Sequence, residues 1–386
     1  MNKITLLFFL LLSSSIWSQT VEKELILKDI ETNLPIEDAT VYIVRTKQSL
    51  LTNSNGVVVF DLKGNTNIVI SHTAYDGITM KSATIKDRQY TIYLKSNLND
   101  LDEIIVSRKH PQKILKDLIK NSVAKLNVPA RLKVYSREFF KLNGTYSYYT
   151  DGLMNFQIFS RANNFKSNIL VEQNRSYGLV EQEITENLLG YNFNNIMENY
   201  YNFKYLEPLL DSKALKEYDF AIKIYSSNKD YYLLTASPSE NAKGLLDDFT
   251  VIYDPDKKII IEVSSFVSPA IVAKMKEKSS RGSRNIYKSL FKTIYRVDGS
   301  NYYLLTSKEE IAFERNDKNK TTDIEVRNYF VTTNFSTKNF SFEDSDVFKD
   351  KNLFNKKNTI LTEYWNDSGL VPTDEEKSII EAISKL

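Results

Sequence analysis

Period-two alternation of apolar and polar residues dominates the chain and predicts strands. The segment VEKELILKD at residues 21–29 alternates in this way, as does ATVYI at 39–43, and the runs VVVF at 57–60 and YTIYL at 90–94 are further predicted strands. Turn-forming residues separate these runs, at 33–35, 53–56, 64 and 76–77. Short strands divided by turn signals are typical of a small β-sandwich. We therefore predict a sandwich of antiparallel sheets over residues 19–106.

The pattern changes to a helical period between residues 107 and 130. Pro111 stands near the start of this segment, and Asn127 and Pro129 mark its end. We predict a linker helix that packs on the following domain, because apolar residues recur at 3.6-residue spacing at Ile114, Leu115, Leu118, Ile119, Val123 and Leu126. A membrane-surface helix is disfavoured, since the polar face is only mildly basic.

Residues 131–345 again alternate and predict a larger antiparallel β-rich domain. Turn residues at 253–257 and 297–299 lie between apolar runs and predict hairpins. Alternation is lost over residues 183–210, which we expect to be helical or irregular and to lie across the sheet. The predicted fold class is mainly β, with few helices.

The C-terminal segment, residues 346–386, ends in a predicted helix. Thr373 and Glu376 form a capping box, with acidic residues in the first turn. Residues Ile379, Ile380, Ile383 and Leu386 make an apolar stripe that we expect to pack on the core.

The first residues have the features of a secretory signal peptide. Lys3 supplies a positive charge, residues 4–12 form an unbroken apolar run, and the small residue Ser18 precedes Gln19. Signal peptidase recognises this arrangement, whereas a membrane-spanning helix needs about 20 apolar residues. We predict export with cleavage near Ser18 after residues 1–18, and a periplasmic or outer-membrane-associated location.

Composition narrows the partners and cofactors. The 51 Lys and Arg residues nearly balance the 49 Asp and Glu residues, which argues against nucleic acid as a partner. The chain has no cysteine, which excludes disulfides and sulfur-ligated metals. After the signal peptide, no segment approaches the roughly 18 consecutive apolar residues of a membrane-spanning helix. We expect no cofactor and no transmembrane segment.

The N-terminal run also resembles a known module. Its motifs follow in the order LPIEDATVYI, TNSNGVVVFDL, NIVISHTAYDGI and YTIYLKSNLNDLDEIIV. This order is similar to the carboxypeptidase-regulatory-like domain of Bacteroidetes cell-envelope proteins. The matching positions are Pro35, Ala39, Val41, Thr52, Gly56, Tyr75, Leu101 and Glu103 to Val106.

Three positions depart from that family pattern. The opening glycine is replaced by LKD at 27–29, Phe60 stands two residues later than the usual Phe, and Ala74 replaces the glycine of Gly-Tyr. The resemblance implies a transthyretin-like β-sandwich, which accompanies peptidases, receptors and many other proteins and is not itself catalytic.

The larger domain has weaker resemblances. The motifs VYSREFF, NGTYSYYTDGLMNF and DFTVIYDPDKKIIIEVS are similar to those of uncharacterised Bacteroidetes envelope proteins that carry the same N-terminal module. The meander of long strands also resembles, by pattern alone, the half-open barrel of periplasmic lipoprotein carriers.

The two histidines, His72 and His110, are too few for ordinary metal or triad chemistry. They belong to different predicted elements, and neither has a second histidine four positions away. Zinc sites need three or four converging ligands, and a Ser-His-Asp triad needs a histidine oriented by an acid. We predict no catalytic, cofactor-binding or metal site, and therefore no enzyme.

Carboxylates remain the other candidates for acid–base chemistry. Adjacent residues on a strand point to opposite faces, which makes poor dyads of Asp247-Asp248 and Glu309-Glu310. Helix capping explains Glu375-Glu376. Asp254 and Asp256 share a turn, but a Ca²⁺ site needs about six oxygen ligands. An enzyme acting through carboxylates alone would need two acids about 5–10 Å apart in a cleft.

Two surface features have alternative interpretations. The basic segment Lys274 to Arg284 is a solvated loop or, alternatively, a contact for anionic lipid headgroups or glycan. Aromatic residues favour sheet packing over a carbohydrate platform at Tyr146, Tyr148, Tyr149, Tyr302 and Tyr303.

These patterns favour a non-enzymatic exported envelope protein. In this interpretation it is a binding or structural module that contacts a protein partner or an envelope component. The alternative is a periplasmic carrier that holds a lipid or acyl ligand in a curved β-sheet, and a glycan is a further candidate ligand.

Overall fold

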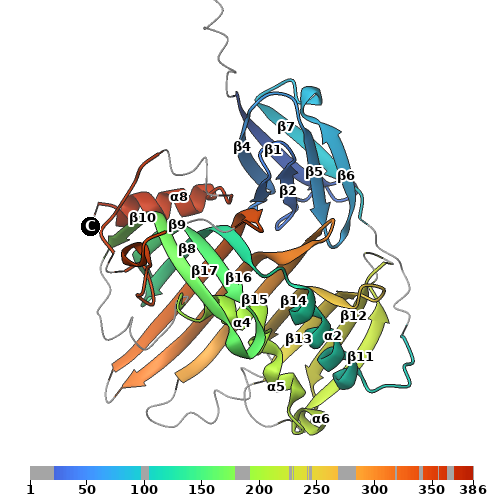
Figure 1. Ribbon diagram of the computed structural model, residues 1–386. Coiled ribbons are helices and arrows are strands. Elements are labelled where there is room, and N and C mark those ends of the chain that lie inside the picture. Colours follow the sequence, from blue (N-terminus) through green and yellow to red (C-terminus); the bar gives the residue numbers. More distant parts are fainter. Residues whose placement is uncertain are drawn as a thin grey trace, which may run out of the picture. The chain divides into compact units, whose positions relative to one another are not determined.

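The computed structural model describes residues 21–96, 104–178, 192–225, 228, 230–240, 242, 246–267, 284–317, 320–338, 342–354, 356–362 and 369–385. The predicted signal peptide, residues 274–283 of the basic segment, and Leu101 and Glu103 of the module motif lie outside these ranges. The chain divides into two compact units, residues 1–96 with 365–371 and residues 97–364 with 372–386. The predicted mainly β fold class is confirmed, since strands form three sheets and helices are few (Figure 1).

The first unit is built from two sheets that enclose one apolar core. One sheet has the order β4 (Val57–Leu62), β1 (Val21–Asp29), β7 (Gln89–Leu94). The other has the order β3 (Gln48–Leu51), β2 (Thr40–Ile43), β5 (Asn67–His72), β6 (Tyr75–Lys81). A short 3₁₀ turn, η1 (Ser82–Thr84), precedes β7. Alternate residues of β1 are buried, as its period-two pattern predicts. The expectation of purely antiparallel sheets is wrong at one pair, because β1 and β7 run parallel.

The residues that carry the module resemblance hold the first unit together. The hydroxyl of Thr52 accepts from the Ala39 amide at 2.9 Å and donates to the Ile36 carbonyl at 2.7 Å. Gly56 has φ +72°, and an added Cβ would lie 2.4 Å from the Leu27 carbonyl oxygen, so only glycine fits this close approach. These positions therefore have structural roles.

Two predicted features of this unit differ in the structure. Asp76-Gly77 is not a turn: both residues lie in β6, where the Asp76 amide donates to the Lys95 carbonyl, and the turn is at residues 73–74. The predicted C-terminal segment 346–386 is also not one piece. Residues 369–371 belong to the first unit, because Leu51 in β3 donates to Gly369 and forms a bridge with Leu370.

The second unit is dominated by one antiparallel sheet of ten strands. In spatial order these are β10 (Lys166–Gly178), β9 (Thr145–Ser160), β8 (Ala130–Leu142), β17 (Lys320–Ser336), β16 (Asn301–Asp317), β15 (Arg284–Asp298), β14 (Ile259–Val267), β13 (Asp247–Asp254), β12 (Tyr232–Pro238) and β11 (Tyr218–Ile224). The two predicted hairpins are present as β13–β14 and β15–β16.

The sheet stays open, because β10 and β11 stand at opposite ends of this order. Short segments pair with both ends: Thr359 exchanges two backbone hydrogen bonds with Asn174 of β10, and Ile105 donates to Ile222 of β11. Pairing of this kind protects exposed edge groups. It also moves a boundary, since Ile104 and Ile105 pair inside the second unit rather than closing the first unit at residue 106.

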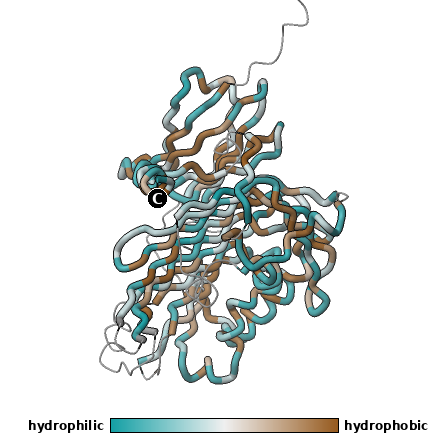
Figure 2. The backbone as a smooth tube through the Cα atoms, turned by 90° about the vertical axis from the view of Figure 1, so that its left-hand side faces the viewer, coloured by the Kyte–Doolittle hydropathy of each residue, from teal (hydrophilic) through white to brown (hydrophobic). Residues whose placement is uncertain are grey.

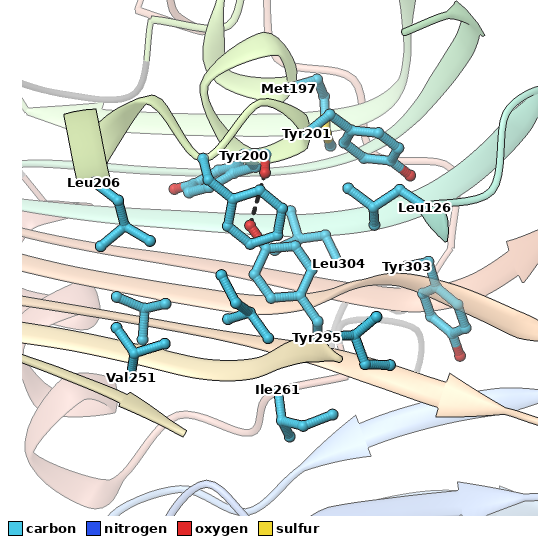
Figure 3. Packing of buried hydrophobic residues seen from close by; sticks show 14 of the residues in the cluster. Leu126, Met197, Tyr200, Tyr201, Leu206, Val251, Ile261, Tyr295, Tyr303 and Leu304 are labelled. Atoms are coloured by element: carbon cyan, nitrogen blue, oxygen red, sulfur yellow. Dashed lines mark hydrogen bonds between the residues drawn. The ribbon is translucent and has the colours of Figure 1, made fainter. Parts of the chain in front are cut away.

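Helices cover part of each face of this sheet. One face, which we call the cleft face, packs against α4 (Ile196–Tyr201), η3 (Lys204–Leu206) and α5 (Glu207–Leu210), followed by α6 (Ala214–Glu217) (Figures 1 and 3). Two further 3₁₀ turns, η2 (Ala162–Asn164) and η4 (Asp344–Asp346), lie in connections. The linker helix α2 (Pro111–Lys125) buries Leu115 and Leu118 in the same core.

Polar and apolar residues alternate along the strands in Figure 2.

The terminal helix α8 (Asp374–Ile383) lies on the opposite face, which we call the α8 face. Its predicted capping box is present, and Glu376 also contacts the buried Arg137 guanidinium at 3.3 Å. Nearby, Asp151 accepts from the Tyr149 hydroxyl at 2.6 Å and from Arg175 at 2.8 Å. Within the residues described above, no helix combines the length and apolar character needed to cross a membrane.

Candidate functional site

A cleft of about 530 Å³ lies between the helical layer and the cleft face of the ten-stranded sheet. This volume falls within the range of about 300–1,000 Å³ that is typical of small-molecule sites. Helical-layer residues supply one wall: Asn192, Asn195, Ile196, Asn199, Tyr200, Tyr205 and Pro208. Strands β13 to β16 supply the other: Asp247, Phe249, Ser265, Ser289, Phe291 and Glu309.

Strand register explains why the sheet wall is assembled in this way. Phe249 is paired with Ser265, Ser265 with Phe291, and Phe291 with Glu309, across four adjacent strands. Directly opposite residues of neighbouring strands point to the same face. One transverse row of the sheet therefore presents two aromatic rings, a hydroxyl and a carboxyl to the cleft.

Aromatic contacts hold the helical wall in place. The Tyr200 hydroxyl lies 2.5 Å from the Ser307 hydroxyl, and the Tyr200 carbonyl accepts from Tyr295 at 2.7 Å (Figure 3). The Tyr205 ring lies 4.7 Å from the Phe291 ring, and its hydroxyl lies 2.8 Å from that of Tyr295. Ring contacts and hydroxyl hydrogen bonds together thus join the helical layer to the sheet.

The same transverse row continues beyond the cleft as a polar row. Glu309 is paired with Asn328, and Asn328 with Glu138. Apolar clusters lie on both sides of it, since Phe330 and Val326 are buried two residues away along β17. We call Glu138, Asn328 and Glu309 the polar row.

Burial changes the acidity of the carboxyls in the cleft and the row. It raises the pKa of Asp247, although the Ser265 hydroxyl opposes this by donating at 3.2 Å. Burial also raises the pKa of Glu309, with opposition from the Asn328 amide. Burial and the nearby Glu309 carboxyl together raise the pKa of Glu138 to about 8.

The paired acids of the sequence are divided by the sheet as predicted. Asp247 and Glu309 line the cleft, whereas Glu310 points to the α8 face and contacts Lys288 at 2.6 Å. Adjacent strands are about 4.8 Å apart, so the backbones of Asp247 and Glu309, three strands apart, are separated by at least about 14 Å. These two acids are not a pair of the spacing that glycoside hydrolysis requires.

Neither histidine lines the cleft. His72 accepts from the Ala74 amide at 3.0 Å and lies edge-on to Tyr75 in the first unit. His110 caps α2 by accepting from the Gln112 amide at 3.2 Å. In the described part of the chain, no three His, Asp or Glu side chains gather closely enough to hold a metal ion.

The other candidate residues have structural roles in the described part of the chain. Asp254 accepts from the amides of Asp256 and Lys257 and so shapes the β13–β14 turn. Four of the five tyrosines considered for a carbohydrate platform are buried: Tyr148, Tyr149, Tyr302 and Tyr303. Tyr146 contacts the Arg327 guanidinium.

The polar row and the asparagines of the cleft were not predicted from the sequence. A usable signal exists, since each of Glu138, Asn328 and Glu309 stands two residues from an apolar residue of its own strand, at Phe140, Val326 and Ile311. That signal gains meaning only when the strand pairing is known, because the three residues are distant in the sequence.

Comparison with known proteins assigns no family. No protein-family model and no curated protein matches the chain. A lipovitellin structure concerned with lipid–protein interactions shares 9% identity and a TM-score of 0.28, over 61% of this chain and 28% of that one. The chain thus spans under a third of the lipovitellin length.

Two bacterial structures are similarly distant. A DUF1329 family protein from Desulfovibrio piger shares 12% identity, with a TM-score of 0.25 over 56% of this chain and 92% of that one. A putative membrane-associated protein of unknown function from Bacteroides fragilis shares 10% identity, with a TM-score of 0.16 over 82% of this chain and 98% of that one. TM-scores this low do not indicate a common fold.

Proposed function

We propose that this chain is an exported, non-enzymatic envelope protein that binds a small amphipathic ligand, of lipid or acyl type, in the cleft of its ten-stranded sheet. The observation that carries this proposal is the composition of the cleft. Its walls combine apolar groups such as Phe249, Phe291 and Ile196 with amides and carboxyls such as Asn199 and Glu309. Apolar walls with a few placed polar groups are typical of small-molecule sites.

The two kinds of wall fit the two ends of an amphipathic molecule. The rings of Tyr205 and Phe291 offer apolar surface, whose burial against an acyl chain contributes about 25 cal/mol per Å². The amides and carboxyls offer hydrogen bonds to a polar head. Asn195 and Pro208 are exposed and Phe249 is buried, so the cleft extends from solvent to the sheet.

The arrangement of acids favours binding over catalysis. Asp247 and Glu309 are too far apart to act on one bond from two sides. Glu138 and Glu309 are nearer, about 10 Å apart at the backbone. Asn328 lies between them in the row, and its amide interacts with Glu309, so the two acids do not face each other directly across an open gap.

The first unit has a different part in this proposal. We infer that it is the carboxypeptidase-regulatory-like module and that it contacts an envelope partner. Its motif residues Ala39, Thr52 and Gly56 support the backbone of the sandwich rather than a site. Such a module supplies attachment, while the ten-stranded unit supplies the ligand site.

Native mass spectrometry of the exported protein tests the proposal. The protein is purified from the periplasm without detergent, as wild type and as Ser289→Trp, which places an indole in the cleft. Ser264→Trp is the matched control, because Ser264 lies on β14 and pairs with Lys292 on the opposite face. We expect a discrete mass excess in wild type and Ser264→Trp that is lost in Ser289→Trp. An equal excess in all three proteins, or none in any, would contradict the proposal.

A further inference from the structure

The polar row is a set of oxygen acceptors held side by side on three strands. Glu138, Asn328 and Glu309 occupy paired positions on β8, β17 and β16, so all three side chains point to the cleft face. Glu309 is also part of the cleft wall. The row therefore begins at the ligand site and extends from it across the sheet.

Asn328 is the unusual member of the row. Its side chain is only 2% exposed, and its amide nitrogen donates to Glu309. Its carbonyl oxygen Oδ1 has no hydrogen-bond donor among the described residues. A buried acceptor without a donor is unfavourable in a native protein, so a water, an ion or a ligand group is expected to supply the missing bond.

No cation from the neighbouring sequence reaches the row. The residues before these three positions are Arg137, Arg327 and Lys308, and strand alternation places all of them on the α8 face. There Arg137 contacts Glu376, and Lys308 contacts Glu310 at 3.4 Å. In the described part of the chain, neither Glu138 nor Glu309 has a salt-bridge partner.

The pKa values of the two carboxyls are raised, as expected for acids that have no cation beside them. Burial raises the pKa of Glu309, and burial with Glu309 beside it raises that of Glu138 to about 8. The Tyr148 hydroxyl is the other titratable group that interacts electrostatically with Glu138. Two carboxyls between apolar clusters resist ionisation unless a cation lies near them.

We propose that the polar row binds a primary ammonium group of the ligand whose apolar part occupies the cleft. A primary ammonium carries three N–H donors and no acceptor. The row offers three acceptors, one from each of Glu138, Asn328 and Glu309. This inference rests on the proposed function and deepens it, because it assigns the chemical class of the polar head.

Calorimetric titration with two short amphiphiles tests the inference. Octylamine and octan-1-ol have the same chain and differ in the head group, so the alcohol measures the cleft and the amine measures cleft and row together. The protein is the full mature chain, as wild type, Glu309→Gln and Glu310→Gln. Glu310→Gln is the matched control, since it changes the adjacent residue on the opposite face.

We expect octylamine to bind wild type about tenfold or more tightly than octan-1-ol, the factor given by one charge-assisted hydrogen bond. Glu309→Gln should lower octylamine affinity by a similar factor and so remove the preference for octylamine over octan-1-ol. Glu310→Gln should keep that preference. Glu138→Gln should act in the same direction as Glu309→Gln, and it replaces that variant if Glu309→Gln does not fold.

Two other outcomes separate the proposals. Equal binding of the amine and the alcohol, unaffected by Glu309→Gln, overturns the ammonium inference and leaves the cleft as a ligand site. Binding of neither compound overturns the proposed function and the inference together.

The source of the ammonium group is distinguished by two further compounds. Lysophosphatidylethanolamine represents a lipid head group, and glucosamine represents a soluble amine. Binding of the lysolipid above that of glucosamine supports a lipid source. The reverse supports a soluble amine held by the row alone, which keeps the ammonium site but contradicts an apolar part in the cleft. Binding of neither, despite binding of octan-1-ol, contradicts it.

Discussion

Replacing Glu138 by Gln removes a carboxyl that the fold favours in its protonated form. Burial, with the Glu309 carboxyl beside it, raises the pKa of Glu138 from 4.5 to about 8. The facing groups are Glu309 and the Tyr148 hydroxyl. Gln has nearly the same shape and stays neutral at every pH, so the substitution isolates the effect of ionisation.

The direction of the change in stability with pH follows from proton binding in the folded and unfolded states. Between about pH 4.5 and 8 the folded chain holds a proton on Glu138 that the unfolded chain has lost, so stability falls as pH rises through this window. The full difference between the two pKa values corresponds to about 5 kcal/mol. Water reaches part of the half-buried Glu138, which weakens the effect. We therefore expect Glu138→Gln to raise the free energy of unfolding by about 2 kcal/mol above about pH 8.

Urea unfolding of the mature chain near pH 5 and near pH 9 measures this effect. Wild type and Glu138→Gln should have similar free energies of unfolding near pH 5, and the variant should be more stable near pH 9. Glu310→Gln is the opposite-sign control: burial alone would raise the pKa of Glu310, but Lys288 and Lys308 outweigh it and lower the pKa. That variant should lose stability near pH 9. A Glu138→Gln variant whose advantage does not grow with pH would refute the reasoning.

Three further substitutions test the packing at the α8 face by different measurements. Asp151→Ala leaves the Arg175 guanidinium without a carboxylate 2.8 Å away and should cost about 3–5 kcal/mol in urea unfolding, so a loss well under 1 kcal/mol would argue against a buried ion pair. Gly178→Ala places a Cβ 2.1 Å from the Ser147 carbonyl oxygen at φ +84° and should lower Tm by the equivalent of about 1–3 kcal/mol, whereas an unchanged Tm would disprove this close approach. Thr373→Ala removes the α8 cap and should cost about 1 kcal/mol, seen as faster amide exchange confined to α8; unchanged exchange would contradict the capping role.

Local features were predictable because the residues that determine them are neighbours in the sequence. The alternation of residues 21–29 becomes β1 with alternate residues buried. The capping box of α8 forms as predicted, with the Thr373 hydroxyl accepting from the Glu376 amide at 3.2 Å. The β13–β14 turn likewise depends on Asp254 and the two amides that follow it.

Pairing between distant segments was not predictable from these patterns. The parallel pair of β1 and β7, and the bridge of Leu370 to Leu51, join segments whose own sequences carry no sign of each other. The polar row depends on β8 pairing with β17. This pairing brings Glu138 and Asn328 side by side, although most of the second unit's sequence separates them. Alternation indicates which face a residue takes but not its partner strand.

The predictions of a signal peptide, a carboxypeptidase-regulatory-like module and a non-enzymatic role stay predictions. The dismissal of the adjacent acidic pairs as dyads rested on strand alternation, and alternation does send Glu309 and Glu310 to opposite faces. Acids on different strands that share a face were not considered as pairs. Glu138 and Glu309 are two such acids.

A crystal structure of the mature chain with octylamine tests the central claim most directly. The account predicts the alkyl chain against Phe291 and Tyr205 in the cleft, with the nitrogen within hydrogen-bond distance of Asn328 Oδ1 and the Glu309 carboxyl. An alkyl chain bound elsewhere, or a cleft filled by protein side chains with no octylamine in it, would contradict the account.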